Sequence, residues 1–514
     1  MLSIIKSMSL IGLNGYLISV EVDVSAGIPC FEIVGLPDTS IKESKERVQT
    51  AIRNSNIQIL SKKIIVNLSP ANIRKEGSMF DLPMAIGVLI ATENIKNKKI
   101  KSILDSTIFI GELSLDGTLN KISGILPICI EAKKLGITQI ILPKENAKEA
   151  SIISGLKILP VNSLKDVISF LNDDSVISPV ENNCSLDQNN IKYDIDFEDV
   201  KGQENVKRAM EISAAGGHNC LLIGSPGSGK TMISRRLPTI LPDMTFDESL
   251  EVTKIHSIVG ILSTNTPLIT QRPFRHPHHT ISGISLVGGG KIPKPGEISL
   301  AHFGVLYFDE LPEFNKNTLE TLRGPLEDKE ITISRVNASI TYPCNFMFIA
   351  SMNPCPCGFY GSKDKPCSCT PEQIKKYIGK ISGPLLDRID LHIEVSPVKF
   401  ENFDNSKPST DSKTIKKRVN KARKIQQERY KDIGIFSNSE LTPKLIEKYC
   451  VLDADSRRIL NAAFNSFGLS ARAYSRILKV ARTIADLDNS KDIKINHLTE
   501  AIQYRNLDRK YWGN

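Results

Sequence analysis

The sequence predicts an α/β protein with a parallel-sheet core, a mixed α/β domain before that core and a helical domain after it. Near the middle of the chain, the apolar run Leu221–Ile223 leads into the stretch GSPGSGKT and then into a helix-compatible segment. Residues 1–172 interleave short strand patterns with helical ones, and apolar residues recur at three- and four-residue spacing beyond residue 412. A strand, a glycine loop and a helix in succession indicate a parallel sheet.

Composition divides the chain of 514 residues into domains and a linker. Residues 1–172 form the first domain, in which strands such as LISVEVDV alternate with helices such as DLPMAIGVLIA. Residues 173–196 are rich in Asn, Asp and Ser and are expected to be a linker. Residues 197–396 carry the parallel-sheet core, and residues 397–514 open with a polar stretch and continue as helices.

The core contains a complete P-loop pattern in the strand, loop and helix context that the pattern requires. Its residues are Gly224, Ser225, Pro226, Gly227, Ser228, Gly229, Lys230 and Thr231. The glycines let backbone N–H groups close around phosphate oxygens, Lys230 can reach the β- and γ-phosphates, and the Thr231 hydroxyl can ligate Mg²⁺. The sequence therefore predicts binding of ATP with Mg²⁺.

A second apolar strand, VLYFDE, ends in two adjacent carboxylates. Asp309 is expected to hold the Mg²⁺ through its water shell, and Glu310 to orient and polarise the attacking water. Such a pair is weak evidence alone, because many strands end in acidic residues. Downstream of a P-loop, it completes a hydrolysis site.

Charge and hydropathy limit the class of protein. The chain has 66 Lys and Arg against 57 Asp and Glu, a formal charge of +9, which permits nucleic-acid binding without requiring it. No apolar run approaches the ~20 residues of a membrane span, and the start MLSIIKSMSLIGLNGY lacks the apolar block and cleavage site of a signal peptide. A soluble cytoplasmic protein with no membrane partner is expected.

Cys355, Cys357, Cys367 and Cys369 form two CxC pairs within a short segment. Thiolates at this density can complete a tetrahedral Zn²⁺ site and staple a loop that has little core of its own. The spacing departs from the commoner CxxC, so unligated thiols are the alternative. A disulfide is not expected in the cytoplasm.

The block from Phe197 to Asp390 resembles the ComM/YifB family of magnesium-chelatase-like AAA+ ATPases, and the likeness continues into both flanking domains. The segments that carry it are FEDVKGQENVKRAMEISAAGGHNCLLIGSPGSGKT, RPFRHPHHTIS, GEISLAHFGVLYFDELPEF, SMNPCPCGFYG and SGPLLDRIDLH. The resemblance implies an AAA+ core with a helical lid domain. It also implies a ring, a hexamer, with ATP held between neighbouring subunits.

Family motifs assign further site residues. Asn353, at the end of the apolar strand FMFIASMN, matches the sensor-1 position that helps to orient the lytic water. Arg388 matches the arginine finger, which enters the next subunit's site and stabilises charge on the γ-phosphate. Arg472 matches the sensor-2 arginine of the lid, with Arg476 one helical turn away as the alternative. Without the resemblance, each arginine reads equally well as a surface ion-pair partner.

Two inserts are candidates for contact with DNA. Residues 272–294 carry RPFRHPHH and LVGGGKIPK, and LEDKEITISRVNASITYP resembles a β-hairpin before sensor 1, with Lys329 and Arg335 near its strands. In related ATPases such loops project into the central pore. We interpret both inserts as contacts to single-stranded or branched DNA.

Other polar clusters leave alternatives open. His276, His278 and His279 can brace a turn, and an imidazole trio also suggests a metal site. The basic helix from Lys413 to Lys431 is either a solvated face of the lid or a DNA-binding surface.

The first domain resembles the proteolytic domain of Lon in RKEGSMFDLPMAIG and in IGELSLDGTLNKISGILPICIEAKKLGITQIILP. Lon-type proteases use a serine and a lysine as a catalytic dyad. Met79 stands at the matching serine position, with Ser78 one residue early, and both candidate lysine positions, Leu126 and Ile128, are apolar. A thioether and aliphatic chains can neither attack a peptide nor take its proton, so an assembly or substrate-guiding module is expected instead of a protease.

The function that the resemblance implies is a ring-forming ATPase, a DNA helicase or branch-migration motor. It would couple ATP hydrolysis to DNA translocation in recombination or natural transformation. The alternative is a chelatase-type motor that remodels a protein partner. The DxSxS metal-adhesion signature is absent from this chain, but it normally belongs to another subunit.

Overall fold

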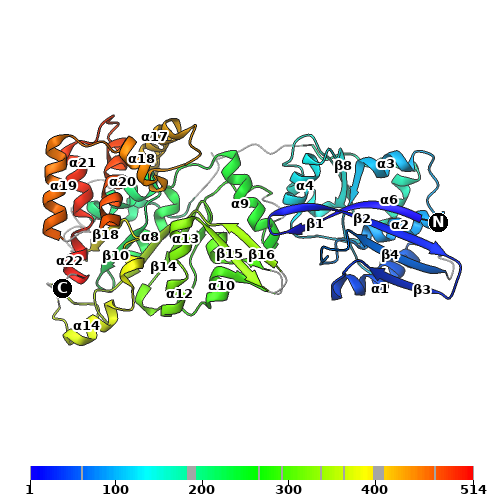
Figure 1. Cartoon of the computed structure of the whole chain (residues 1–514), viewed down its shortest axis with the longest axis horizontal. Helices are drawn as coiled ribbons and strands as arrows, with labels where there is room; N and C mark the ends of the chain where they lie inside the picture. The colour runs from blue at the N-terminus through cyan, green and yellow to red at the C-terminus, as the bar shows by residue number, and fades with distance from the viewer. Residues whose placement is uncertain are drawn as a thin grey trace. The chain divides into compact units, whose positions relative to one another are not determined.

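The computed structural model describes residues 2–58, 62–181, 193–263, 267–290, 293–335, 338–362, 365–397, 410–467 and 470–512. They form two compact units (Figure 1): one comprises Met1–Leu186 with Phe246–Ile269, and the other Asp187–Thr245 with Thr270–Asn514. Residues 182–192 of the expected linker, and residues 398–409 of the polar stretch that follows the core, lie outside the described residues. Within the described part of the chain, no helix is long and apolar enough to cross a membrane.

The first unit mixes parallel and antiparallel strands with helices, as the sequence predicts. One sheet has the order β1-β2-β4-β3, and a parallel sheet has the order β5-β8-β9. Helix α2 contacts β1 and β2 and is buried along its whole length, because its sequence DLPMAIGVLIA has no polar face. The elements are β1 (Leu2–Ile11), β2 (Asn14–Ser25), β3 (Cys30–Val34), α1 (Thr39–Asn54), β4 (Lys63–Ser69), α2 (Asp81–Ala91), α3 (Ile100–Ser106), β5 (Thr107–Phe109), β6 (Glu112–Leu113), β7 (Leu119–Asn120), α4 (Ile125–Lys134), β8 (Gln139–Pro143), α5 (Ala147–Ala150), β9 (Lys157–Val161) and α6 (Leu164–Leu171).

Helix α9 (Phe246–Val259) also belongs to the first unit, although it follows the P-loop helix in the sequence. It packs on α4, and the backbone N–H of Gly124 donates to the carbonyl of Ser257 at 3.0 Å. The Ser257 hydroxyl donates to the buried carboxylate of Glu149, which also accepts the backbone N–H of Leu126. A segment of the predicted ATPase core is therefore part of the core of the Lon-like region.

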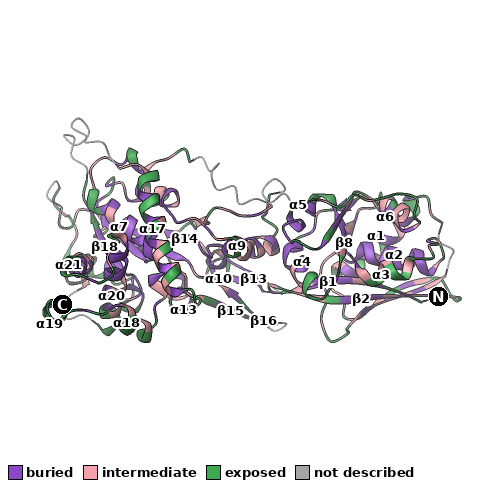
Figure 2. Cartoon of the chain, turned by 90° about the horizontal axis from the view of Figure 1, so that it is seen from above, coloured by how far each residue is buried: buried purple, intermediate pink, exposed green. Residues whose placement is uncertain are grey.

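The second unit is built on a fully parallel sheet of order β11-β14-β17-β10-β18, which confirms the predicted parallel-sheet core. Its strands are short and apolar because both faces are covered; in Figure 2 the labelled strands β14 and β18 and helix α7 are largely buried. The elements up to β18 are α7 (Glu204–Gly216), β10 (Cys220–Gly224), α8 (Lys230–Arg236), β11 (Phe274–Arg275), α10 (Gly283–Val287), β12 (Gly288–Gly289), β13 (Lys294–Pro295), α11 (Glu297–Leu300), β14 (Val305–Phe308), α12 (Lys316–Glu320), α13 (Arg323–Asp328), β15 (Glu330–Arg335), β16 (Ala338–Pro343), β17 (Met347–Met352), α14 (Pro371–Ile378), α15 (Gly383–Leu386) and β18 (Leu391–Val395).

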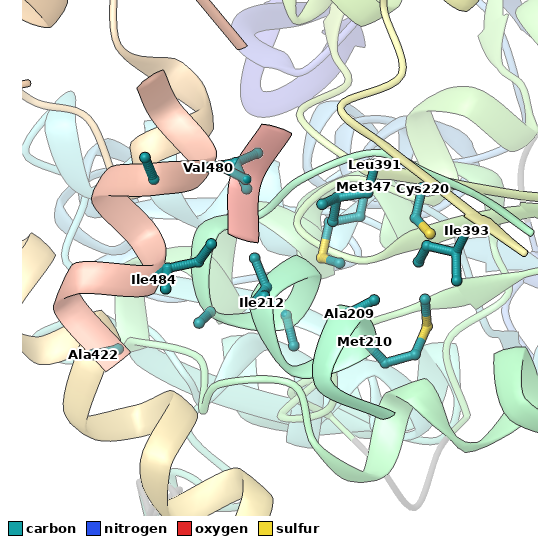
Figure 3. Packing of buried hydrophobic residues seen from close by; sticks show 14 of the residues in the cluster. Ala209, Met210, Ile212, Cys220, Met347, Leu391, Ile393, Ala422, Val480 and Ile484 are labelled. Carbon is teal, nitrogen blue, oxygen red and sulfur yellow. The ribbon is translucent and has the colours of Figure 1, made fainter. Parts of the chain in front are cut away.

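The C-terminal region is helical, as predicted. Its helices are α17 (Ser412–Tyr430), α18 (Pro443–Tyr449), α19 (Ala454–Phe467), α20 (Ala471–Leu487), α21 (Ile495–Gln503) and α22 (Asn506–Trp512). Figure 3 shows how it joins the sheet: Val480 and Ile484 of α20 face Ile212 of α7, whose Ala209 and Met210 lie near the strand residues. All of these side chains are buried, and each buried large aliphatic chain contributes about 2 kcal/mol. The sheet and the helical region therefore share one hydrophobic core.

Candidate nucleotide site and neighbouring clusters

The P-loop joins β10 to α8 at the carboxyl edge of the parallel sheet. Gly227 and Gly229 have φ angles of +77° and +90°, a left-handed conformation that glycine adopts without strain. A Cβ added at Gly227 would meet no atom within 4 Å. The loop is therefore an open backbone concavity with room for phosphate oxygens.

Lys230 opens helix α8, and its ammonium group faces the loop. Nζ donates to the carbonyl oxygens of Gly224 at 2.7 Å and Ser225 at 2.9 Å, and to Oδ1 of Asn353 at 3.1 Å. Burial lowers the pKa of Lys230 from its ordinary value, while nearby carboxylates act in the opposite direction. The P-loop cation and the predicted sensor-1 amide thus lie in direct contact.

Asp309 lies beside the P-loop threonine. Its carboxylate accepts hydrogen bonds from Thr231 Oγ1 at 2.8 Å and from the Ser351 hydroxyl. Burial alone would raise the pKa of Asp309, but the hydrogen bonds from Ser351 and Thr231 outweigh it and hold the pKa below its ordinary value. An ionised carboxylate next to a hydroxyl is an oxygen donor set that suits Mg²⁺.

Glu310 directly follows β14 with a φ angle of 54°, a left-handed conformation that is uncommon for glutamate. Its backbone N–H donates to Oδ1 of Asp309 at 3.1 Å and to the Ser351 hydroxyl at 3.4 Å. The residue as a whole is exposed. These bonds turn the chain so that the second carboxylate leaves the strand beside the first.

Sequence reasoning missed other side chains at this edge. Gln203, with a φ angle of 60°, donates through Nε2 to the carbonyls of Ser228 and Ser396, each at 2.9 Å, and so braces the P-loop. His276 follows β11, the strand paired with β14, and its ring lies 4.9 Å from that of Tyr307. The pairing of β11 with β14 is the only signal that could have placed His276 here, and strand order is not readable from spacing.

The predicted arginines lie in a different place, in a cavity of about 590 Å³. Arg388 is 7% exposed, donates to the Pro384 carbonyl at 2.7 Å, and pairs with Glu327, while its buried Nε–H has no hydrogen-bond partner. Arg472 is more exposed, with Nη2 3.8 Å from the same glutamate. Lys329 lines the same cavity, and burial lowers its pKa. The cavity is thus rich in cations.

This cavity lies at the amino edge of the sheet. Arg388 precedes β18 and Asn219 precedes β10, and Nδ2 of Asn219 donates to the Arg388 carbonyl at 2.8 Å. Arg476 lies beside them, paired with the buried Asp390. Because β10 and β18 are parallel, about 13 Å of strand separates this edge from the P-loop. The structure therefore separates the arginines from their own chain's P-loop.

The four cysteines come together. Sγ of Cys355 lies 3.4 Å from Sγ of Cys357 and 3.6 Å from that of Cys367, and all four sulfur atoms, including that of Cys369, lie within 4.8 Å of one another. Tetrahedral zinc with Zn–S bonds of about 2.3 Å requires sulfur atoms about 3.8 Å apart, so the donor set fits. The Phe359 backbone N–H is the main cause that lowers the pKa of the Cys357 thiol to about 5.

The histidine trio does not form a metal site. Among the described residues, the only group of His, Cys, Asp or Glu side chains close enough to hold a metal is that of the four cysteines. His278 and His279 instead stack with ring centroids 4.1 Å apart, and Nδ1 of His278 lies 2.9 Å from Oγ1 of Thr280. These contacts favour the interpretation that the histidines brace a turn.

The two predicted inserts form one layer. The predicted hairpin is present as β15 and β16, and it buries Ile333 and Tyr342 while exposing hydroxyl groups on its other face. The Tyr342 hydroxyl donates to the carbonyl of Pro293 in the other insert at 2.8 Å, and a Cβ at Gly288 would approach Ile333 within 2.7 Å. Lys291, a predicted contact, lies outside the described residues.

Cations of helix α17 pair with acids of the second unit, which favours a structural role for this face of the helix. Three such pairs are Lys416 with Asp243, Arg418 with Glu211 and Arg429 with Asp486.

The Lon-like region has no serine and lysine dyad at the expected positions. Leu126 and Ile128 are fully buried, and Met79 packs against the apolar clusters. The Ser78 hydroxyl donates to the carboxylate of Glu112. Lys75, three positions earlier in the chain, donates to the Pro70 carbonyl instead.

Models of protein families match most of the chain. The model described as magnesium chelatase, subunit ChlI, matches residues 196–403. The model described as subunit ChlI of Mg-chelatase matches residues 20–146, and that of the ChlI C-terminal region matches residues 409–505.

Individual relatives extend over nearly the full length. The chain is 43% identical over 510 residues to "Uncharacterized protein YifB" of Escherichia coli, which covers 99% of this chain and 98% of that protein. It is 42% identical over 511 residues to "Competence protein ComM" of Haemophilus influenzae, with the same coverage. A stretch of 195 residues is 28% identical to Lon protease 2 of Bacillus subtilis, covering 34% of this chain and 33% of that protein.

Proposed function

The chain belongs to the ComM/YifB family of magnesium-chelatase-like AAA+ ATPases, and on that premise we propose that it is a ring-forming motor that couples ATP hydrolysis to movement on DNA. One observation carries the proposal. The chain presents a P-loop at one edge of its sheet and an arginine cavity at the other, so neither edge holds a complete hydrolysis site.

Such a chain completes its sites by head-to-tail association. A contact between two different surfaces of identical subunits generates a ring when the rotation closes. We propose that Arg388 and Arg472 face the P-loop of the neighbouring subunit, and the family resemblance supports a hexamer. Arg476, which is paired with the buried Asp390, is the weaker candidate for sensor 2.

The roles within the P-loop edge follow from its contacts. Lys230 neutralises phosphate charge, and Thr231 with Asp309 would hold Mg²⁺, which supplies further neutralisation of the β- and γ-phosphate oxygens. Glu310 orients water and accepts its proton, while the Asn353 amide, held by Lys230, helps to position that water. Steady-state hydrolysis with and without single-stranded and branched DNA tests the function as a whole.

The layer formed by the two inserts is the proposed DNA-contacting surface. Lys294 and Arg335 lie on it, and the net charge of +9 and the name "Competence protein" of the Haemophilus influenzae relative support the assignment to branch migration or unwinding in recombination or natural transformation. The matched chelatase model favours the alternative, a motor that remodels a protein partner. Hydrolysis that is indifferent to every DNA form would support this alternative.

Replacing Lys294 and Arg335 together with Ala is expected to lower DNA affinity and to reduce the slope of log K against log salt by about 2, since each lost phosphate contact removes about one unit. Fluorescence anisotropy of labelled single strands across a salt series measures both. The matched control replaces Lys98 and Lys101, exposed lysines of the first unit, with the same change in net charge. An unchanged slope in the Lys294 and Arg335 variant contradicts the assignment.

We propose that the four cysteines hold one structural zinc ion. Protein purified without added zinc is expected to contain about one zinc per chain, and Cys355→Ser with Cys357→Ser to lose it, because two ligands cannot complete a tetrahedral site. Elemental analysis by mass spectrometry gives the ratio. Metal-free protein that is folded and active would leave the cysteines as unligated thiols.

The Lon-like region is proposed to act in assembly or substrate guiding. No ATP-dependent cleavage of casein is expected, because Ser78 bonds to Glu112 and the candidate lysine positions are buried and apolar. Release of labelled peptides is the measurement. Cleavage that disappears in Ser78→Ala would place the protein among the proteases.

A further inference from the structure

The thiol cluster is connected to the nucleotide site at both of its ends. Strand β17 ends at Met352, the next residue is Asn353, and Cys355 lies two positions further on. The Asn353 side chain accepts a hydrogen bond from Lys230 at 3.1 Å. The first pair of cysteines therefore directly follows a side chain that contacts the P-loop lysine.

The second pair of cysteines leads back to the same residue. Cys369 is followed by Thr370, which caps helix α14. Tyr377, near the end of that helix, is buried and hydrogen-bonds to the backbone of Asn353. A metal that joins the two pairs would close a loop whose two ends both hold Asn353.

The loop also touches the P-loop itself. Gly358 has a φ angle of +84°, and a Cβ there would lie 2.4 Å from Cδ of Pro226. Its backbone N–H donates to the Cys355 carbonyl at 3.0 Å, and the Tyr360 N–H donates to the Cys355 sulfur at 3.3 Å. The part of the loop that packs on Pro226 is thus held by a proposed zinc ligand.

We infer that zinc held by the four cysteines positions Asn353 and Pro226 for nucleotide, so that zinc affinity and nucleotide affinity are coupled. The inference rests on the proposed ATPase function and on the proposed zinc ion. Coupling of binding free energies is reciprocal: if zinc raises the affinity for nucleotide by some factor, nucleotide raises the affinity for zinc by the same factor.

The first test uses the full-length wild-type protein and needs no hydrolysis. Zinc transfer to the chromogenic chelator 4-(2-pyridylazo)resorcinol is followed in excess Mg²⁺, with and without a saturating non-hydrolysable ATP analogue. Nucleotide is expected to slow zinc release about 5-fold or more. Lys230→Ala is the matched control and is expected to lose this protection with its zinc content unchanged. Equal release rates with and without bound nucleotide overturn the inference.

The second test removes the distal ligands. Cys367→Ser with Cys369→Ser leaves the residues next to Asn353 intact, and it is expected to lose zinc, to weaken nucleotide binding and to lower kcat about 10-fold, the loss of part of a positioned-water contribution. Cys369→His, which keeps a zinc ligand, is expected to restore zinc, nucleotide affinity and kcat. Cys30→Ser, a half-buried cysteine of the first unit, is the matched control.

The outcomes separate the failures. If the zinc-free variant is folded by circular dichroism and retains wild-type nucleotide affinity and kcat, the coupling is wrong and zinc is only a staple. If wild-type protein contains no zinc, the zinc proposal fails together with this inference. If wild-type protein binds and releases zinc as expected but binds no nucleotide, the proposed function itself fails.

Discussion

Glu310→Gln is expected to leave ATP bound and to stop its turnover, whereas Lys230→Ala is expected to prevent binding. The glutamine keeps the shape of Glu310 but cannot accept a proton, and loss of a general base lowers kcat by about 10²- to 10⁴-fold. Removing Lys230 takes away the cation that contacts the P-loop carbonyls and Asn353. Equilibrium binding of a fluorescent ATP analogue, together with steady-state phosphate release, distinguishes the two effects.

The chain offers a matched control for this prediction. Glu313 is also exposed and lies three residues further on, where it pairs with Lys380 at 3.6 Å. Glu313→Gln is expected to hydrolyse ATP at the wild-type rate. Normal hydrolysis by Glu310→Gln would remove Glu310 from the proposed mechanism.

Arg388→Ala is expected to lower ATP hydrolysis by about 10³-fold or more, the usual contribution of an arginine finger, and the loss should be complemented in trans. Arg388→Ala subunits retain an intact P-loop, and Lys230→Ala subunits retain an intact Arg388. In an equal mixture, random head-to-tail assembly makes about one interface in four intact. Partial recovery of activity in mixed rings, compared with either variant alone, is the expected result.

The complementation experiment has an internal check. Co-assembly is verified with two affinity tags before activity is measured, and Arg53→Ala, an exposed arginine of the first unit, is expected to behave as wild type. Absence of recovery in rings shown to contain both variants would place Arg388 in its own chain's site. That outcome conflicts with its position at the amino edge of the sheet.

Much of the nucleotide edge could be predicted from the sequence. The P-loop is continuous, so GSPGSGKT carries its own geometry, and Asp309 and Asn353 each end an apolar strand. In a parallel sheet the carboxyl ends of strands meet at one edge, which is why residues far apart in the chain form a cluster at Lys230. The AAA+ fold with a parallel sheet and a helical C-terminal region is confirmed for the same reason.

Other parts of the site depend on distant surfaces. The spacing of the four cysteines is atypical, and only the folded loop brings their sulfur atoms within 4.8 Å of one another. Likewise, sequence spacing cannot tell that the hairpin β15–β16 packs on the segment around Gly288, or that Gly358 packs on Pro226. These contacts form because apolar surfaces and close backbone approaches must be satisfied across long separations in the chain.

The sequence by itself determined the chemistry of the P-loop, the strand ends that hold Asp309 and Glu310, and the loss of the Lon dyad at Met79, because each depends on neighbouring residues and local periodicity. Only the tertiary structure decided that Arg388 lies at the opposite edge from the P-loop, and that helix α9 belongs to the Lon-like unit. Strand order and the burial of α9 against α4 decide both, since these arrangements bury the most apolar area and leave Glu149 hydrogen-bonded.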